Sequence, residues 1–268
     1  MSEIDEITDE QLMRYARHVV LEEVGEEGQA RLLRSSALVV GAGGLGSPVL
    51  MYLAAAGVGR LGIVDFDTVD ITNLQRQIVH GTEDIGRAKV ESAIDRLRSI
   101  NPEIEVTTHN ERLVAGNALD IISRYDLVAD GSDNFDTRYL VNDACYFAKV
   151  PLVTAALLRY EGQLTTVKAY REGDNPCYRC LFPNQPDRDL VPGCEQAGIF
   201  GSVAGVLGTM QATEVLKELL GLGDGLSGRL LLYDALGANL RELKVRRDAK
   251  CALCGEAPSI TELASAAE

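Results

Sequence analysis

A short glycine-rich turn constrains the fold of this chain more than any other feature. Gly41, Gly43 and Gly46 form the pattern G-x-G-x-x-G, after the apolar run Ala37–Val40 and before a helical pattern over Ser47–Ala56. Glycines at this spacing allow a tight turn and the close approach of a phosphate to backbone N–H groups at a helix N-terminus. The order strand, turn, helix predicts a Rossmann-like nucleotide-binding fold. The alternative is a tight turn that binds nothing.

Apolar runs and helical patterns alternate through the first part of the chain, which predicts a mostly parallel α/β sheet. Further strands are expected at Leu61–Val64, Ile104–Thr108, Asp126–Ala129 and Pro151–Thr154, and further helices at Glu26–Arg34, Arg87–Ser99 and Thr137–Lys149. A capping box over Thr8–Gln11 predicts a helix start near the N-terminus.

The pattern changes in the second half of the chain. Gln163–Tyr170, Arg229–Tyr233 and Asn239–Val245 have the character of strands around a long helix over Ser202–Leu220, so the sheet is expected to be mixed and partly antiparallel. We therefore expect a single domain over residues 1–255, with a nucleotide half at about 35–155, a second half at about 156–255, and a flexible tail over 256–268.

Charged side chains follow the predicted strands at positions where a nucleotide would bind. Asp65 ends the second strand, where a carboxylate accepts hydrogen bonds from both ribose hydroxyls. Arg76, Lys89 and Asp133, the last with Asn134 beside it, are placed to converge beyond the carboxyl ends of the strands. Alone, each would be a solvated charge or a helix cap. Together, two cations and a carboxylate able to hold Mg²⁺ favour a triphosphate ligand.

Six cysteines occur, and four of them form two C-x-x-C pairs, Cys177 with Cys180 and Cys251 with Cys254. Four thiolates make a closed, tetrahedral zinc site of the structural kind. A redox dithiol is the alternative. Cys194 stands apart, in an irregular segment with no C-x-x-C partner.

Composition excludes some classes of partner and location. The 268 residues carry a formal net charge of −14, which argues against a general binder of nucleic acid or of anionic membranes. The N-terminal segment is acidic and lacks the features of a secretory signal, and no apolar run is long enough to span a membrane. A cytoplasmic location is therefore expected.

These motifs resemble the ubiquitin-activating superfamily, in particular its small homodimeric branch. That branch comprises the adenylyltransferases of molybdopterin synthase and of thiazole synthesis and the archaeal activators of ubiquitin-like modifiers. The resemblance covers about Glu10 to Gly255. It rests on the glycine turn, on the segments Asp65–Gln77, Gly86–Lys89 and Asp130–Asn134, and on both cysteine pairs.

The resemblance implies a role for each matching position. Lys89 would neutralise developing charge, Asp133 would hold Mg²⁺, and Arg17 would reach the site from the other subunit of a homodimer. Cys194 matches a reactive cysteine that some members use for a thioester or persulfide step. The nucleotide-contacting set would be Gly41, Gly43, Gly44, Gly46, Asp65, Thr72, Asn73, Gln75, Arg76, Lys89, Asp133 and Asn134.

The activity that the resemblance implies is adenylyl transfer. The C-terminal glycine carboxylate of a ubiquitin-like or sulfur-carrier protein, on a Gly-Gly tail, would attack the α-phosphorus of ATP. Pyrophosphate would leave and an acyl-adenylate would remain, for sulfur transfer to molybdopterin, tRNA or thiamine, or for protein conjugation. Catalysis would consist mainly of positioning and charge stabilisation.

Two other functions fit parts of the sequence. An NAD-dependent oxidoreductase would use the same glycine turn, but it would leave Arg76, Lys89 and Asp133 without a role. A zinc-stabilised adaptor without catalysis would bind a ubiquitin-like protein, but its phosphate-binding residues would be expected to have degenerated.

Overall fold

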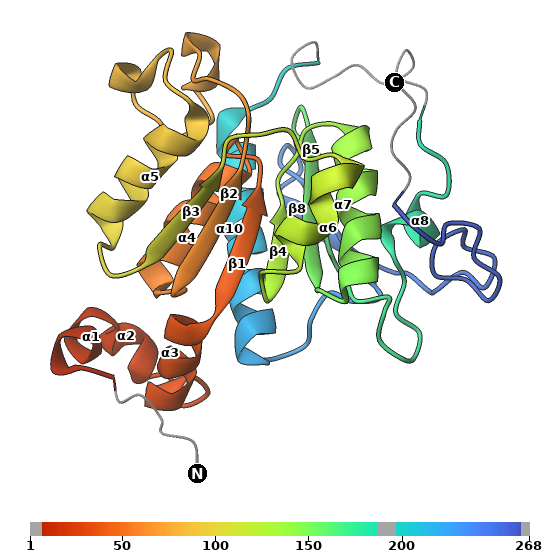
Figure 1. Ribbon diagram of the computed structural model, residues 1–268, viewed down its shortest axis with the longest axis horizontal. Coiled ribbons are helices and arrows are strands. Elements are labelled where there is room, and N and C mark those ends of the chain that lie inside the picture. Colours follow the sequence, from red (N-terminus) through yellow and green to blue (C-terminus); the bar gives the residue numbers. More distant parts are fainter. Residues whose placement is uncertain (1–6, 187–196, 264–268) are drawn as a thin grey trace.

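The computed structural model describes residues 7–186 and 197–263, and they fold around one mixed sheet (Figure 1). The sheet has eight strands in the order β3-β2-β1-β4-β5-β6-β7-β8. The first five in this order are parallel, and the pairs from β5 to β8 are antiparallel. The strands are β1 (Ser36–Val40), β2 (Arg60–Val64), β3 (Glu105–His109), β4 (Leu127–Asp130), β5 (Leu152–Leu158), β6 (Glu161–Val167), β7 (Arg229–Asp234) and β8 (Asn239–Lys244). The predicted change from a parallel to a mixed sheet is confirmed.

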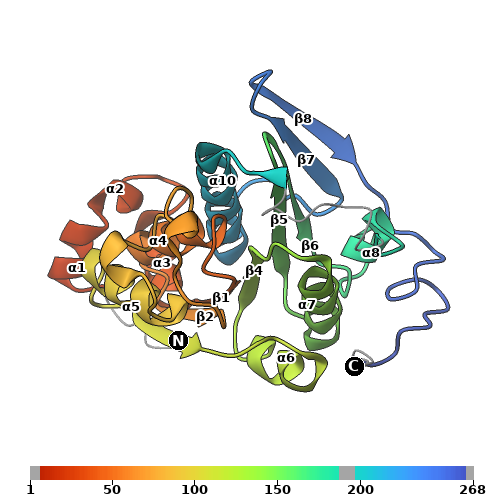
Figure 2. The same cartoon turned by 90° about the horizontal axis from the view of Figure 1, so that it is seen from above.

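Helices cover both faces of the sheet because its central strands are apolar on both sides. The helices are α1 (Asp9–Arg14), α2 (Ala16–Val19), α3 (Gly25–Arg34), α4 (Gly46–Ala56), α5 (Lys89–Ile100), α6 (Ala115–Ile122), α7 (Phe135–Ala148), α8 (Tyr178–Leu181) and α10 (Gly201–Leu220), with 3₁₀ turns η1 (Ile71–Asn73) and η2 (Thr82–Asp84). Figure 2 shows α4, α5 and α10 on one side of the sheet and α6 and α7 on the other. Successive β1 residues belong to different cores: Val39 packs with the first helix group and Leu38 with the second.

Several elements differ from the sequence prediction. Helix α6 was not expected, and β5 continues four residues beyond the predicted end, to Leu158. Helix α7 begins at Phe135 instead of Thr137, because the Asn134 side chain accepts the Thr137 N–H at 2.9 Å and caps the helix. The capping box at Thr8 is confirmed, with both of its hydrogen bonds formed.

The small helices α1–α3 lie at the edge where β1 begins, below the sheet in Figure 1. Tyr15, between α1 and α2, fixes them there. Its hydroxyl accepts a 2.8 Å hydrogen bond from the Asn101 side chain, and its ring lies against Gly57 at the C-terminal end of α4. The glycine turn is at the other end of α4. An 11-residue helix is about 16 Å long, so these helices are well separated from the turn.

The last described residues pack against the body of the chain. Ser259 and Ile260 both donate backbone hydrogen bonds to the Ala252 carbonyl, and Ile260 and Leu263 contact the core. Flexibility of the tail 256–268 stays a prediction. In the described ranges, no helix combines the length and the apolar character needed to cross a membrane.

Candidate active site

The glycine turn connects β1 to α4 and leaves no room for side chains. Gly41 has a φ of 89°, and a Cβ at Gly46 would lie 1.8 Å from the Gly41 carbonyl oxygen. Glycine is therefore required at both positions. Helix α4 has no side-chain N-cap, so its first N–H groups remain available to an anion.

Asp65 lies at the end of β2, next to this turn. Its Oδ2 accepts the Ala42 N–H at 2.8 Å, and its Oδ1 accepts the Asp67 N–H at 2.9 Å. The residue is 8% exposed. Burial raises the pKa of Asp65, while the charge of Lys89 and the two N–H donors act in the opposite direction. The turn and the carboxylate are thus held together as one unit.

Lys89 begins α5 and supplies a buried cation beside Asp65. Its Nζ lies 2.9 Å from Oδ2 of Asp67, and the residue is 6% exposed. A lysine this buried is normally paired, and here the partner carboxylate is half exposed. An incoming phosphate can therefore compete with Asp67 for the ammonium group.

Arg76 lies over the glycine turn. A Cβ at Gly44 would be 3.5 Å from Cγ of Arg76, so the arginine stem packs directly on the turn. Its guanidinium donates to the Thr72 carbonyl at 2.9 Å, while the Thr72 hydroxyl donates to Asp70 at 2.7 Å. The 3₁₀ turn η1 therefore fixes the position of Arg76.

The other residues predicted in this segment are structural in the ligand-free chain. The Asn73 side chain accepts the Asp70 N–H at 3.2 Å. The Gln75 carbonyl packs on Gly201, where a Cβ would be 2.2 Å away. The segment thereby joins the glycine turn to the start of α10.

Asp133 and Asn134 follow β4 on the neighbouring loop. Both are exposed, and the Asn134 amide lies 3.4 Å from Asp133 Oδ1. The loop itself is firmly placed, because a Cβ at Gly41 would lie 3.2 Å from the Gly131 carbonyl oxygen. Below it, buried Asp130 accepts the Ser132 N–H at 3.0 Å and the Thr154 hydroxyl at 2.9 Å.

Two predicted residues are not part of this constellation. Arg17 is exposed on α2, beyond the far end of α4, so it cannot reach the turn of its own chain. Cys194 lies outside the described residues. The remaining predicted nucleotide-site residues lie in the glycine turn, at the end of β2, over η1 to Arg76, at the start of α5, and on the loop after β4.

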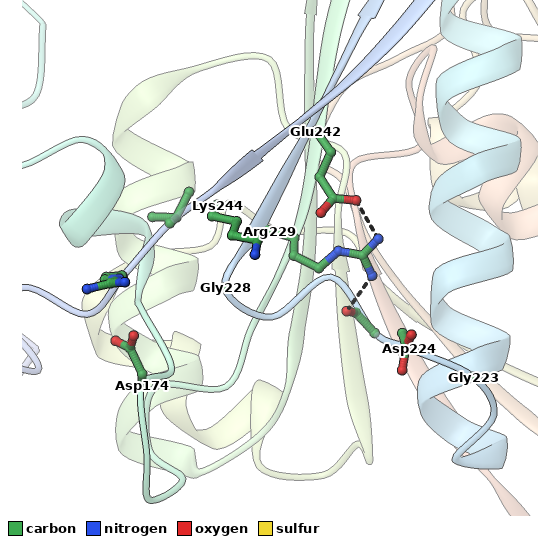
Figure 3. Close-up of a pocket in the computed structure, with 10 residues that line it drawn as sticks. Asp174, Gly223, Asp224, Gly228, Arg229, Glu242 and Lys244 are labelled. Carbon is green, nitrogen blue, oxygen red and sulfur yellow. Dashed lines mark hydrogen bonds and ion pairs between the residues drawn. The ribbon is translucent and has the colours of Figure 1, made fainter.

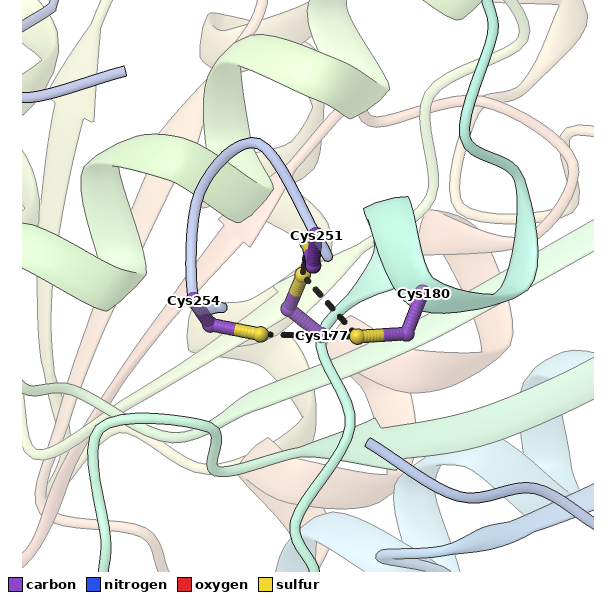
Figure 4. Close-up of side chains that lie close together, drawn as sticks. All are labelled: Cys177, Cys180, Cys251 and Cys254. Carbon is purple, nitrogen blue, oxygen red and sulfur yellow. Dashed lines mark hydrogen bonds between the residues drawn. The ribbon is translucent and has the colours of Figure 1, made fainter. Parts of the chain in front are cut away.

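The four predicted cysteine ligands form a compact cluster (Figure 4). Their sulfur atoms all lie within 4.8 Å of one another, which fits a single tetrahedral ion. Cys177 and Cys251 are 3.5 Å apart, and Cys180 and Cys254 are 3.4 Å apart. Hydrogen bonds among the thiols raise the pKa of Cys177 and lower that of Cys180. Cys145 is fully buried in the core, as expected, and burial raises its pKa.

A separate hollow of about 570 Å³ lies between β7, β8 and the turn after α10 (Figure 3). Its lining includes Arg229, Lys244 and Glu242, and Arg229 pairs with Glu242 at 2.5 Å. The 20-residue α10 spans about 30 Å between the glycine turn and this hollow. It is therefore not the nucleotide site.

A comparison with known families matches residues 15–253 to the model of the ThiF family. This range is most of the chain and includes every site residue described above. The chain belongs to the ThiF family.

Relatives of this ThiF-family chain have named activities. It is 51% identical over 258 residues to the sulfur carrier protein adenylyltransferase of Thermus thermophilus, covering 96% of this chain and 95% of that protein. It is 48% identical over 246 residues to the SAMP-activating enzyme E1 of Haloferax volcanii, covering 92% and 90%. It also matches the adenylyltransferase and sulfurtransferase MOCS3 of Sus scrofa at 51% identity, but it spans only 56% of that longer protein.

Solved structures support the same fold at low sequence identity. The crystal structure of E. coli MccB with succinimide superposes with a TM-score of 0.79 at 22% identity, covering 95% of this chain and 76% of that one. A crystal structure of E. coli MccB with ATP gives a TM-score of 0.74 at 22% identity, covering 90% and 73%.

The sequence did not identify two buried residues that touch the glycine turn of this ThiF-family chain. Gln77 lies beside Gly43, and its Oε1 is buried with no hydrogen-bond partner among the described residues. His80 donates to the Ala42 carbonyl. Both lie just beyond the predicted segment that ends in Arg76, and neither has a periodic or paired pattern that marks it.

Proposed function

We propose that this chain adenylates the C-terminal glycine carboxylate of a ubiquitin-like or sulfur-carrier protein with Mg-ATP and releases pyrophosphate. The observation that carries the proposal is the grouping of Asp65, Arg76 and Lys89 around the glycine turn. Phosphate chemistry needs these cations, whereas a nicotinamide cofactor does not. The named activities of the relatives at 48–51% identity support the same reaction.

The residues divide the work of the reaction. Asp65 accepts the ribose hydroxyls, and the N–H groups of the turn and of α4 bind phosphate oxygens. Arg76 and Lys89 stabilise the charge that develops as pyrophosphate leaves. The attacking carboxylate is already ionised at neutral pH, so no general base is needed.

Asp133 is the proposed magnesium ligand, with Asn134 beside it. Carboxylate and amide oxygens suit Mg²⁺, which binds through one or two carboxylates together with substrate phosphates. The exposure of Asp133 at the carboxyl edge of the sheet fits such a shared site. Bound there, the ion would neutralise phosphate charge during the transfer.

Zinc is the proposed ion of the cysteine cluster. Four sulfur ligands with no open position are typical of structural zinc. The site would join the segment after β6 to the segment after β8, which are 74 residues apart in sequence. It would therefore stabilise the second half of the chain without entering the reaction.

A homodimer would complete the nucleotide site with Arg17 from the partner. Apolar side chains near Arg17 are exposed to solvent, including Met13 at 75% and Val20 at 72%. Tyr52 on α4 and Val206 on α10 extend the exposed apolar surface. A second copy that covers this face would bury these residues and could bring its own arginine to the phosphates.

The carrier protein is expected to dock on the second half of the chain, at the edge strand β8. All six β8 residues are exposed, and Leu240 and Leu243 are among them. Residues 239–250 carry five Lys and Arg against two acidic residues, on a chain with net charge −14. A carrier with an acidic rim and an apolar centre would fit this surface.

The experiment is carrier-dependent exchange of pyrophosphate into ATP. Purified candidate carriers that end in Gly-Gly would be compared with versions that lack the last two residues. Exchange that needs the intact tail and Mg²⁺ supports the proposal. NAD binding without an effect of Mg²⁺ would favour an oxidoreductase, and carrier binding without exchange would favour an adaptor.

A covalent step at Cys194 is a further proposal for the same reaction. Its thiolate would attack the acyl-adenylate and release AMP to form a thioester, or it would receive sulfur as a persulfide from a sulfur donor. Non-reducing mass spectrometry of the enzyme after turnover tests this step. Full sulfur transfer by Cys194→Ala with no adduct on the wild type would rule it out.

A further inference from the structure

His80 is a buried histidine that contacts the glycine turn from inside the protein. Its Nε2 lies 3.0 Å from the Ala42 carbonyl oxygen, and its Nδ1 lies 2.8 Å from the Ser92 hydroxyl. The residue is 5% exposed, so solvent does not compete for these bonds. A carbonyl oxygen can only accept, and Nε2 must therefore carry a proton.

The surroundings favour the neutral ring. Burial lowers the pKa of His80, and the nearby charge of Lys89 lowers it further, while the bond to Ala42 and the charge of Asp84 act in the opposite direction. In the neutral ring with Nε2 protonated, Nδ1 accepts the proton of the Ser92 hydroxyl.

The bond to Ala42 also determines where the next amide points. The Ala42 C=O and the Gly43 N–H belong to one planar trans peptide, so they point in opposite directions. His80 holds the carbonyl inward, which turns the Gly43 N–H away from the core. That N–H has no hydrogen-bond partner within the described part of the chain.

The same contacts connect three parts of the nucleotide site. Ser92 lies on α5, about one turn after Lys89. On the other side of His80, the Ala42 N–H donates to Asp65 at 2.8 Å. A series of hydrogen bonds thus runs from the phosphate-binding helix through His80 to both peptide groups of Ala42 and to the ribose-binding carboxylate. In a low-dielectric interior, such a series is stronger than its separate bonds.

We propose that His80 is a positioning residue for adenylyl transfer, which locks the Ala42–Gly43 peptide so that the Gly43 N–H faces a phosphate of the nucleotide. This inference rests on the proposed function, because it takes the ligand of the turn to be a nucleotide with phosphates. His80 itself touches neither nucleotide nor carrier. Its effect is confined to phosphate recognition, since the peptide that it orients is the phosphate-facing one.

The test compares two replacements of His80. His80→Gln keeps an amide N–H that can reach the Ala42 carbonyl, whereas His80→Phe keeps a flat ring without a donor. His109→Gln is the matched control, because His109 is partly buried on β3 and its ring pairs with Tyr125 instead of the turn. Affinity for ATP and for adenosine is measured by calorimetry, and KM for ATP and for the carrier by pyrophosphate exchange.

We expect His80→Phe to weaken ATP binding by about tenfold, the usual effect of one lost charge-assisted hydrogen bond, with adenosine affinity and carrier KM changed less than about twofold. His80→Gln should recover most of the ATP affinity, and His109→Gln should match the wild type. Equal losses for ATP and adenosine, or no rescue by Gln, would overturn the inference. Wild-type protein that binds no nucleotide would overturn the proposed function, and this inference with it.

A second measurement does not depend on whether the variants fold. Nitrogen-15 NMR of the wild-type imidazole should show the Nε2-protonated tautomer, with little change between about pH 6 and 8. Ser92→Ala should shift the Nδ1 signal, because it removes the hydroxyl that Nδ1 accepts. A ring protonated at Nδ1 alone would contradict the bond to Ala42 and sink the proposal even if ATP affinity had changed as expected.

Discussion

The stem of Arg76 packs on Gly44, with Cγ only 3.5 Å from the point where a Cβ would be. The guanidinium therefore starts from the surface of the phosphate-binding turn and needs little reorganisation to meet a triphosphate. This contact joins a cation to the turn although the two residues are separated by the whole of α4 and β2.

The first prediction concerns the charges at the phosphates. Arg76→Ala and Asp133→Ala should each lower pyrophosphate exchange by about a hundredfold or more, because each removes preorganised stabilisation of phosphate charge. Their thermal midpoints should stay within a few degrees of wild type. Arg96→Ala, at an exposed position of α5, is the control and should retain activity. Full exchange in either active-site variant would contradict the assignments.

The second prediction concerns pH and Asp65. Burial raises its pKa, and ribose binding needs the ionised carboxylate, so ATP affinity should fall as the pH is lowered through this raised value. In the ligand-free chain, the folded state holds the proton more tightly than the unfolded state. The ionised group therefore lowers stability above its folded pKa, and this loss disappears as the pH falls toward the unfolded value. Calorimetric titrations and melting curves across pH measure both effects.

Asp65→Asn tests both parts of that prediction in one variant. It should melt at a higher temperature than wild type at pH 7 and should bind ATP much more weakly, with little dependence on pH. A variant that binds ATP as well as wild type does would show that the ribose is not held here.

The third prediction concerns the cysteine cluster. Protein purified without chelators should contain about one zinc ion per chain, and Cys177→Ser or Cys254→Ser should lose it. Because binding free energy of a structural ion contributes to folding, the thermal midpoint should fall by about 10 °C or more. Cys145→Ala, which alters a core cysteine outside the cluster, should keep its zinc. A zinc content far below one per chain in the wild type would contradict the site.

The fourth prediction tests whether Arg17 acts on the partner subunit. Arg17→Ala and Asp133→Ala should each be inactive alone. After mixing with subunit exchange, half of the dimers would be mixed and each would have one intact site, so about a quarter of wild-type activity should return. No recovery, with exchange verified by mass spectrometry, would mean that Arg17 serves its own chain or has no role.

The parts of the fold that sequence predicted are those with a strong local pattern. The glycine turn, Asp65 and the two cysteine pairs each combine a fixed spacing with one chemical purpose, and the structure places them as expected. Helix α6 was missed because its N-cap is Val114, which has no capping side chain of its own. The cap of α7 was missed because Asn134 and Asp136 are equally good candidates in sequence.

His80 shows why part of the site could not be predicted. Its partners are a backbone carbonyl 38 residues before it and a hydroxyl 12 residues after it. A backbone carbonyl occurs at every position, so no residue type marks this contact in the sequence. Only the three-dimensional arrangement of β1, α5 and the segment between them reveals it.

Strand β8 has an unpaired edge and is exposed along its whole length. Such an edge normally invites copies of a protein to stack into insoluble assemblies. Arg241, Glu242 and Lys244 place alternating charges along it, and burying them against an identical strand would be unfavourable. A surface open to one class of partner is in this way kept from recruiting its own kind.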